Sequence, residues 1–210
     1  MENSKSGSKR LFYVVYFLDP TVQALLDAIR LLSNTLEKGR AHITIRGPYS
    51  RPQSFSKLER LIRGTQVCAE GLGTFFDEGQ NTVFIRCNSE YLRKAWKKTD
   101  YGYNPHITLY DGDSREFAEH LLAKLPALNQ QFQIKADGIS PLLSNRGQRS
   151  WYLMSAFNSP LISSILGTEL NADKLKDLST RTRLEYVEAL AQNLGQYVQK
   201  SEASAAQSIG

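Results

Sequence analysis

The sequence predicts an α+β fold in which two similar lobes pack around a central groove, with a helical region at the C-terminus. Two observations predict this fold. Strand-like and helix-like segments alternate along residues 11–158, and the order motif strand, helix, strand, strand, helix occurs twice. The strings His-Ile-Thr-Ile at 42–45 and His-Ile-Thr-Leu at 106–109 take equivalent places in this repeat. Because duplicated lobes normally pack about an approximate two-fold axis, we expect the motif strands to face each other across a cleft.

The first half of the repeat begins with the apolar, aromatic run Leu11–Leu18, which predicts a strand. Pro20 suits the first turn of a helix, and a stripe at helical spacing follows it. This stripe consists of Val22, Leu25, Leu26, Ile29 and Leu32. We then expect the first motif strand over 41–46, a helix that ends at Gly64, and strands near 66–76 and 82–88.

A helix capped by Ser89 closes the first occurrence of this order, and the second motif strand over 105–110 opens the next. A helix that stops at Pro126 follows, and then strands near 131–139 and 150–157. Related strings mark the two halves, such as Ala69-Glu70-Gly71 and Ala136-Asp137-Gly138.

The ends of the chain lie outside the repeat. Residues 159–200 are expected to form helices, in two or more pieces, that pack on the core or extend it. The last piece has an apolar stripe made of Leu184, Val187, Ala191, Leu194 and Val198. Residues 1–10 and 201–210 are polar or small, and we expect them to be a disordered lead and a disordered tail.

Composition limits the class of protein. No segment approaches the roughly 18 apolar residues that cross a bilayer, and Met1–Arg10 lacks the apolar stretch of a secretory signal. Cys68 and Cys87 have no metal-ligand spacing and fall in strand-like runs, where free cysteine is common. We therefore expect a cytoplasmic protein with no membrane association.

The net charge of +5 is unevenly distributed. Residues 1–63 hold 11 Lys and Arg against 5 Asp and Glu, and the remainder holds 15 against 16. The excess surrounds the first motif, where Arg40, Arg46 and Arg51 are nearest. This bias favours an anionic partner, although a solvated surface would also explain it.

The two motifs carry the chemistry. Side chains alternate along a strand, so His42 and Thr44 share one face, and His106 and Thr108 share one face of the second strand. The intervening apolar residues point into a core. Two such strands brought together supply two imidazoles and two hydroxyls, which suits acid–base chemistry on a phosphate ester.

The same alternation extends the predicted site. It places Arg46 beside His42 and Thr44, and Tyr110 beside the second pair. Arg46 would neutralise phosphate charge, and Tyr110 would stack on a base or donate to phosphate. Tyr49 and Tyr103 are further candidates at the groove edge. Aromatic residues near a basic groove suit single-stranded RNA ends.

These residues resemble the 2H phosphoesterase superfamily, which includes the 2′–5′ RNA ligase-like proteins and cyclic phosphodiesterases. The resemblance rests on the two His-x-Thr-x motifs, one in each lobe. Its context is the apolar first strand Leu11–Leu18, the glycine-rich strand Glu70–Phe75 and Asn104-Pro105 before the second motif. It covers residues 11–158.

The resemblance implies a bilobal fold with two pseudo-two-fold-related β/α lobes and both motifs in the groove. It implies hydrolysis, without metal or other cofactor, of 2′,3′-cyclic phosphate or 2′–5′ bonds in RNA ends or small nucleotides. One of His42 and His106 would act as general base and the other as general acid, and Thr44 and Thr108 would hold phosphate oxygens. We expect a monomer. A 2′–5′ RNA ligase and a catalytically idle nucleotide- or RNA-binding module are the alternatives.

Three simpler interpretations remain open for individual residues. A metal site could combine the two motif histidines with Asp111 or Asp113, although no ligand spacing favours it. The two motif threonines could be mere β-formers. His120, which lies on a helix outside both motifs, is expected to be a surface or boundary residue.

Overall fold

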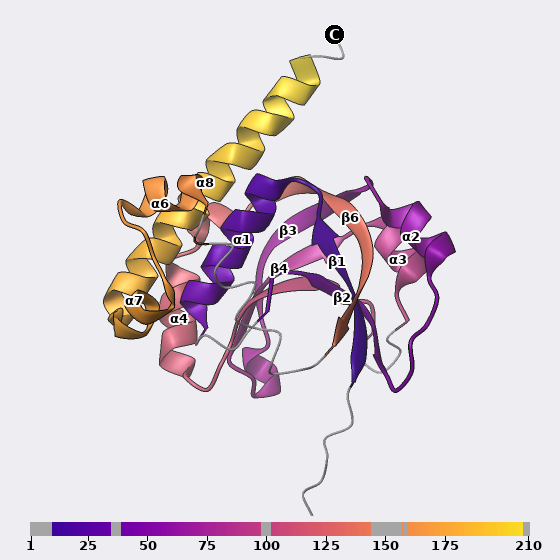
Figure 1. The fold of residues 1–210 in the computed structure, drawn as a ribbon, viewed down its shortest axis with the longest axis horizontal. Coiled ribbons are helices and arrows are strands. Elements are labelled where there is room, and N and C mark those ends of the chain that lie inside the picture. Colours follow the sequence, from indigo (N-terminus) through magenta and orange to yellow (C-terminus); the bar gives the residue numbers. More distant parts are fainter. Residues whose placement is uncertain (1–9, 35–38, 98–101, 144–156, 158, 208–210) are drawn as a thin grey trace, which may run out of the picture.

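The computed structural model describes residues 10–34, 39–97, 102–143, 157 and 159–207. A curved sheet forms the centre of the protein, with helices on both sides of it in Figure 1. Within the described segments, no helix has both the length and the apolar character needed to cross a membrane. The strand predicted near 150–157 and nearly all of the predicted N-terminal lead lie outside the described residues.

The α+β class predicted from the sequence is confirmed, and the strands pair in antiparallel fashion throughout. The sheet closes on itself in the order β1-β2-β5-β4-β3-β6. Its strands are β1 (Leu11–Phe17), β2 (Ile43–Tyr49), β3 (Gln66–Thr74), β4 (Thr82–Asn88), β5 (His106–Asp111) and β6 (Gln131–Leu143).

The helices begin and end close to the predicted positions. They are α1 (Pro20–Ser33), α2 (Ser56–Ile62), α3 (Glu90–Ala95), α4 (Arg115–Ala123), α6 (Pro160–Leu166), α7 (Ala172–Asp177) and α8 (Thr180–Gln207), with short 3₁₀ turns η1 (Phe76–Glu78) and η2 (Pro126–Leu128). Asp19 caps α1 by accepting hydrogen bonds from the amides of Thr21 and Val22.

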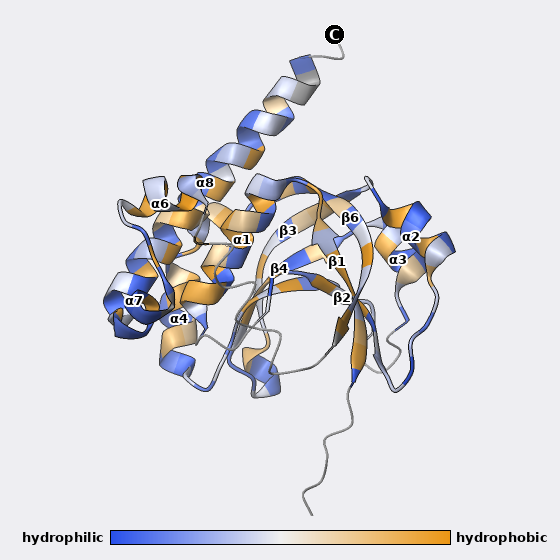
Figure 2. Cartoon of the chain, in the orientation of Figure 1, coloured by the Kyte–Doolittle hydropathy of each residue, from blue (hydrophilic) through white to orange (hydrophobic). Residues whose placement is uncertain are grey.

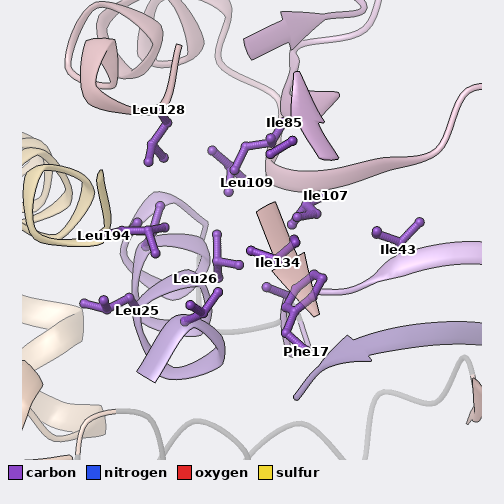
Figure 3. Close-up of a cluster of buried hydrophobic side chains, with 14 of the residues drawn as sticks. Phe17, Leu25, Leu26, Ile43, Ile85, Ile107, Leu109, Leu128, Ile134 and Leu194 are labelled. Carbon is purple, nitrogen blue, oxygen red and sulfur yellow. The ribbon is translucent and has the colours of Figure 1, made fainter. Parts of the chain in front are cut away.

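The main core lies between the sheet and the helical layer made by α1 and α8. Figure 3 shows Leu25 and Leu26 of α1 and Leu194 of α8 gathered near Ile107 and Leu109 of the second motif strand. All five side chains are buried. The apolar motif residues therefore point toward the helices, as predicted.

The strand register pairs equivalent positions of the repeat. β2 and β5 meet at Ile43 and Ile107, which are the second residues of the two motifs. β3 and β6 pair Val67 with Ile134, and these two residues are also equivalent when the related strings of the two halves are aligned. Each half thus meets the other at matching residues in two places.

The C-terminal region is helical in three pieces, as predicted, and α8 packs along α1. Every residue of the predicted α8 stripe is buried. The prediction of a disordered tail from residue 201 is wrong as far as Gln207, because α8 continues to that residue. The last turns are rich in alanine, a strong helix former, and the Glu202 carboxylate accepts a 2.8 Å hydrogen bond from the Gln133 amide. Figure 2 shows this end of α8 as largely hydrophilic.

Candidate active site

The two motif strands bring both His/Thr pairs onto one face of the sheet. Ile43 and Ile107 form the pair that joins β2 to β5, and an antiparallel register extended by one residue sets His42 opposite Thr108 and Thr44 opposite His106. Directly opposed Cβ atoms lie about 5 Å apart and diagonal neighbours about 7–8 Å apart. We call this side of β2 and β5 the motif face. The two imidazoles stand there as diagonal neighbours.

Both imidazoles are oriented by the same local contact. His42 Nδ1 lies 2.7 Å from the Arg40 carbonyl oxygen, and His106 Nδ1 lies 2.8 Å from the Asn104 carbonyl oxygen. A carbonyl can only accept, so Nδ1 carries the hydrogen in each ring. In the neutral form of each ring, Nε2 is therefore the nitrogen that carries the lone pair.

The two histidines have different neighbours. The Tyr16 ring stands edge-on to His42, with 6.1 Å between ring centroids, and the Arg40 guanidinium lies 4.8 Å above the Tyr16 ring. His106 contacts the rings of Phe75 and Phe84, at centroid distances of 5.3 and 4.9 Å. His42 thus lies beside a tyrosine that carries a cation on its ring, whereas His106 lies between two phenylalanine rings.

Gly73 on β3 leaves room for the Phe84 ring. A Cβ atom at this position would lie 2.5 Å from the Phe84 ring, well inside van der Waals contact. Any side chain there would displace Phe84, which contacts His106.

Arg86 brings a cation to the motif face that sequence reasoning missed. It pairs directly with His106 across β4 and β5, so the two side chains share a face. One of its nitrogens donates to the Leu72 carbonyl oxygen, and the residue is exposed. Strand alternation along β4 predicts that Arg86 and Phe84 share a face, because they are two residues apart. Only the strand register shows that Arg86 lies opposite His106.

A bulge follows the threonine in each motif strand. Val14 pairs with Thr44 while Tyr13 pairs with Arg46, which leaves Ile45 as an extra residue. In β4 and β5, Phe84 pairs with Thr108 while Val83 pairs with Tyr110, so an extra residue again follows the threonine. A bulge of one residue reverses the alternation of side chains beyond it.

The bulges make the strand-alternation prediction wrong for Arg46 and Tyr110. Arg46 donates from Nε to the Ala95 carbonyl oxygen at 2.7 Å and lies over the Phe55 ring. Tyr110 is buried in the core, and its hydroxyl contacts the amide and carbonyl of Ser114. Neither residue shares the motif face.

The two other predicted tyrosines have structural contacts. Tyr49 is half-buried and packs into an aromatic cluster with Tyr13 and Phe55, so its binding role stays a prediction. Tyr103 stays near the second motif, but its hydroxyl contacts the backbone of Ser89.

Polar side chains of α1 and of Asn34, the residue that follows it, form hydrogen bonds with the backbone of the motif strands. Arg30 donates from Nε to the Gly39 carbonyl oxygen at 2.9 Å, and from Nη1 to the Thr108 carbonyl oxygen. Asn34 donates to the Leu109 carbonyl oxygen at 2.6 Å and accepts from the Asp111 amide at 3.0 Å. These bonds satisfy backbone groups that the single β2–β5 pair leaves open.

Side chains of α1 also form hydrogen bonds with Arg40 and Ala41, which precede the first motif. The Asp27 carboxylate accepts from the Ala41 amide at 2.6 Å and from Arg40 Nε at 3.1 Å, and Gln23 donates to the Ala41 carbonyl oxygen at 3.0 Å. Sequence reasoning assigned only the apolar stripe of α1. The signal that it missed is the polar series Gln23, Asp27, Arg30 and Asn34, which recurs at helical spacing.

Electrostatics favours a neutral His42. Burial, together with the positive charge of Arg30 and a smaller contribution from His106, lowers the pKa of His42 from 6.5 to about 4. Burial also lowers the pKa of Arg30, to about 10, so Arg30 still carries its charge at neutral pH. The effect of His106 on His42 agrees with the two rings lying close together.

No family model matches this chain. A comparison with curated proteins also finds no significant match. The 2H resemblance therefore rests on the two motifs and on their arrangement.

A separate cavity of about 620 Å³ lies between α4, α8 and the end of β5. Tyr110, Asp111, Asp113 and His120 line it, so His120 and the two carboxylates proposed as metal ligands share this cavity. Within the described residues, no three His, Cys, Asp or Glu side chains are grouped in a way that could hold a metal ion.

Proposed function

We propose that this protein is a phosphodiesterase of the 2H type, which hydrolyses 2′,3′-cyclic phosphate or 2′–5′ phosphodiester bonds without a metal. The observation that carries the proposal is the pairing of Ile43 with Ile107 between β2 and β5. Extended by one residue in each direction, this antiparallel register sets each motif histidine opposite the threonine of the other motif. β2 and β5 lie side by side in the sheet and do not face each other across a cleft as expected, so a phosphate would lie on the motif face, where it would meet two imidazoles and two hydroxyls at once.

The two histidines take different roles in the proposed reaction. Neutral His42 accepts a proton from water at Nε2, and the resulting hydroxide attacks phosphorus. Protonated His106 donates its Nε2 proton to the leaving ribose oxygen as the P–O bond breaks. The lowered pKa of His42 supports its assignment as the base.

The remaining groups on the motif face stabilise charge. The hydroxyls of Thr44 and Thr108 donate to non-bridging phosphate oxygens, and Arg86 supplies a positive charge next to His106. These donors act most strongly when negative charge builds up on the oxygens in the transition state.

The strand pairing supports a proposal for the quaternary state, and the two cysteines support one for the compartment. One chain supplies both motifs, and matching residues pair where the halves meet, so we propose a bilobal monomer as the active unit. Cys68 and Cys87 are both free thiols, which is typical of a reducing compartment such as the cytoplasm.

A hydrolysis assay tests the proposal. Purified protein is given a panel of 2′,3′-cyclic mononucleotides, 2′–5′ dinucleotides and oligoribonucleotides with cyclic phosphate ends, with a chelator present. We expect turnover that persists with the chelator and falls at least about 100-fold in each of His42→Ala and His106→Ala. Turnover abolished by the chelator, or retained in both variants, contradicts the mechanism. Nucleotide binding with no turnover indicates a binding module instead, and joining of RNA ends into 2′–5′ bonds indicates a ligase.

A further inference from the structure

The positive charge of the chain is concentrated on two segments, residues 51–63 and 90–97. Together they carry seven Lys and Arg against two Glu, a net charge of +5, which equals the formal net charge of the whole chain. α2 and α3, which these segments contain, pack against each other at one side of the sheet (Figure 1). We call their joint surface the basic shelf. Its exposed cations include Arg51, Lys57, Arg60, Arg93 and Lys97.

Most cations of the basic shelf lack a carboxylate partner. Arg63 pairs with Glu59 and Asp137, and Lys94 pairs with Glu90. Among the described residues, none of the other five cations forms an ion pair with a carboxylate. On the helical side, Arg115, Lys124, Lys176 and Arg181 are each paired with a carboxylate. The exposed Lys174 and Lys200 have no such pair among the described residues. The shelf therefore gathers more unpaired cations than the helical side, and these attract an anion.

The basic shelf adjoins both motif strands. Arg46, two residues past Thr44, donates to the Ala95 carbonyl oxygen at the end of α3. Arg93 of α3 lies 4.0 Å above the Tyr103 ring, and the next residue, Asn104, orients His106 through its carbonyl. Arg46 reaches α3 from the face of β2 opposite the motif face, so the path from the motif face to the shelf runs past Asn104 and Tyr103 beside the second motif.

Aromatic rings lie among these cations. The Trp96 ring stands edge-on to Tyr103 at a centroid distance of 5.6 Å, and Lys94 lies 5.5 Å from the Tyr91 ring centroid. Basic surfaces with interspersed aromatic rings suit single-stranded nucleic acids, whose phosphates and bases they contact without sequence preference.

We propose that the basic shelf binds the phosphate backbone of single-stranded RNA whose end reacts at the motif face. The inference rests on the proposed function and narrows its substrate class from small nucleotides to RNA ends. A cyclic mononucleotide has one phosphate and cannot occupy the motif face and the shelf together. An oligonucleotide carries further phosphates that are available to the shelf while its end occupies the motif face.

A charge-reversal experiment tests the shelf. The shelf variant combines Lys57→Glu, Arg60→Glu and Lys97→Glu. The matched control combines Lys174→Glu, Lys176→Glu and Arg181→Glu, which makes the same change of charge at exposed positions of α7 and α8. Arg93 is left intact because its contact with Tyr103 lies close to His106. Turnover is measured with a 2′,3′-cyclic mononucleotide and with a ten-residue RNA that ends in the same group.

We expect kcat/KM for the RNA to fall at least about 10-fold in the shelf variant and less than about 3-fold in the control. The salt dependence of log kcat/KM should weaken by about 0.7 for each RNA phosphate that the shelf variant no longer neutralises. The cyclic mononucleotide should be turned over equally by all three proteins. An equal loss on both substrates, or an equal loss in the control, overturns the proposal.

If the unsubstituted protein turns over neither substrate, the proposed function fails. RNA binding by the shelf is then tested separately, by fluorescence anisotropy of the labelled RNA with each of the three proteins. Binding that disappears only in the shelf variant supports the proposal. Absence of RNA binding overturns it, as does preference for phosphatidylserine vesicles over RNA.

Discussion

Arg30 of α1 donates a hydrogen bond to the carbonyl oxygen of Thr108, a residue of the second motif that lies 78 positions further along the chain. The same guanidinium donates to Gly39, three residues before His42. A buried cation thus ties together the two segments that carry the candidate site, at the place where their strands share one pair.

Arg30 should contribute to the position of the acid limb of the pH–rate profile. Burial lowers the pKa of His42 most, and the positive charge of Arg30 lowers it further, so Arg30→Gln should raise the pKa of His42 part of the way toward 6.5 and move the acid limb of kcat/KM to higher pH. Arg30→Lys keeps the charge and should leave the limb near its original position. The measurement is kcat/KM from pH 4 to 8, with circular dichroism to confirm that the variants stay folded. A uniform loss at every pH would instead indicate a purely structural role.

Arg86 and Arg46 should differ sharply when the same substitution is made in each. Arg86→Gln removes a cation from the motif face and should lower kcat/KM about 10- to 100-fold, because a hydrogen bond to a charged group contributes about 1.5–3 kcal/mol. Arg86→Lys should restore part of the loss. Arg46→Gln, whose side chain bonds to Ala95 away from that face, should change kcat/KM less than about 3-fold. Equal effects of the two Gln variants would contradict the assigned bulge in β2.

Substitution of Tyr110 should change stability but not activity, whereas substitution of Thr108 should change activity but not stability. Tyr110→Phe removes the hydroxyl contacts with Ser114 and should lower the free energy of unfolding by about 1 kcal/mol, with kcat/KM within about twofold of the original. Thr108→Val should do the reverse and lower kcat at least about 10-fold, while Thr108→Ser retains activity. Urea denaturation and steady-state kinetics measure the two effects. A loss of kcat in Tyr110→Phe would indicate that Tyr110 contacts the substrate after all.

Asn34 should be essential for holding the second motif strand. Asn34→Ala removes the hydrogen bonds to the Leu109 carbonyl and from the Asp111 amide, and an unsatisfied buried acceptor such as the Leu109 carbonyl costs about 1–3 kcal/mol. We expect the free energy of unfolding to fall by about 2–4 kcal/mol. Asn193→Ala is the control. Within the described segments, this half-buried side chain bonds only to the Ala189 carbonyl of the same helix, and the substitution should cost less than about 1 kcal/mol. Thermal and urea denaturation of both variants provides the comparison.

Local patterns in the sequence were sufficient for much of the fold and for the centre of the candidate site. The apolar stripes of α1 and α8 and the buried isoleucines of the motifs follow from helical and strand periods, which depend on neighbouring residues alone. The placement of His42 with Thr44, and of His106 with Thr108, follows from the same strand period, because no bulge interrupts either pair.

Beyond the threonines, only the tertiary structure decided which residues reach the site. The bulges at Ile45 and Leu109 exist because β1 and β4 pair with the motif strands in a particular register, and hydrogen bonds between distant segments set that register. The strand period therefore misplaced Arg46 and Tyr110. The same long-range register brought Arg86 opposite His106, and the packing of α1 beneath both motifs gave Arg30 its two carbonyl partners. The sequence by itself determined which side chains alternate along each strand, whereas the pairing of strands across the sheet determined where that alternation breaks.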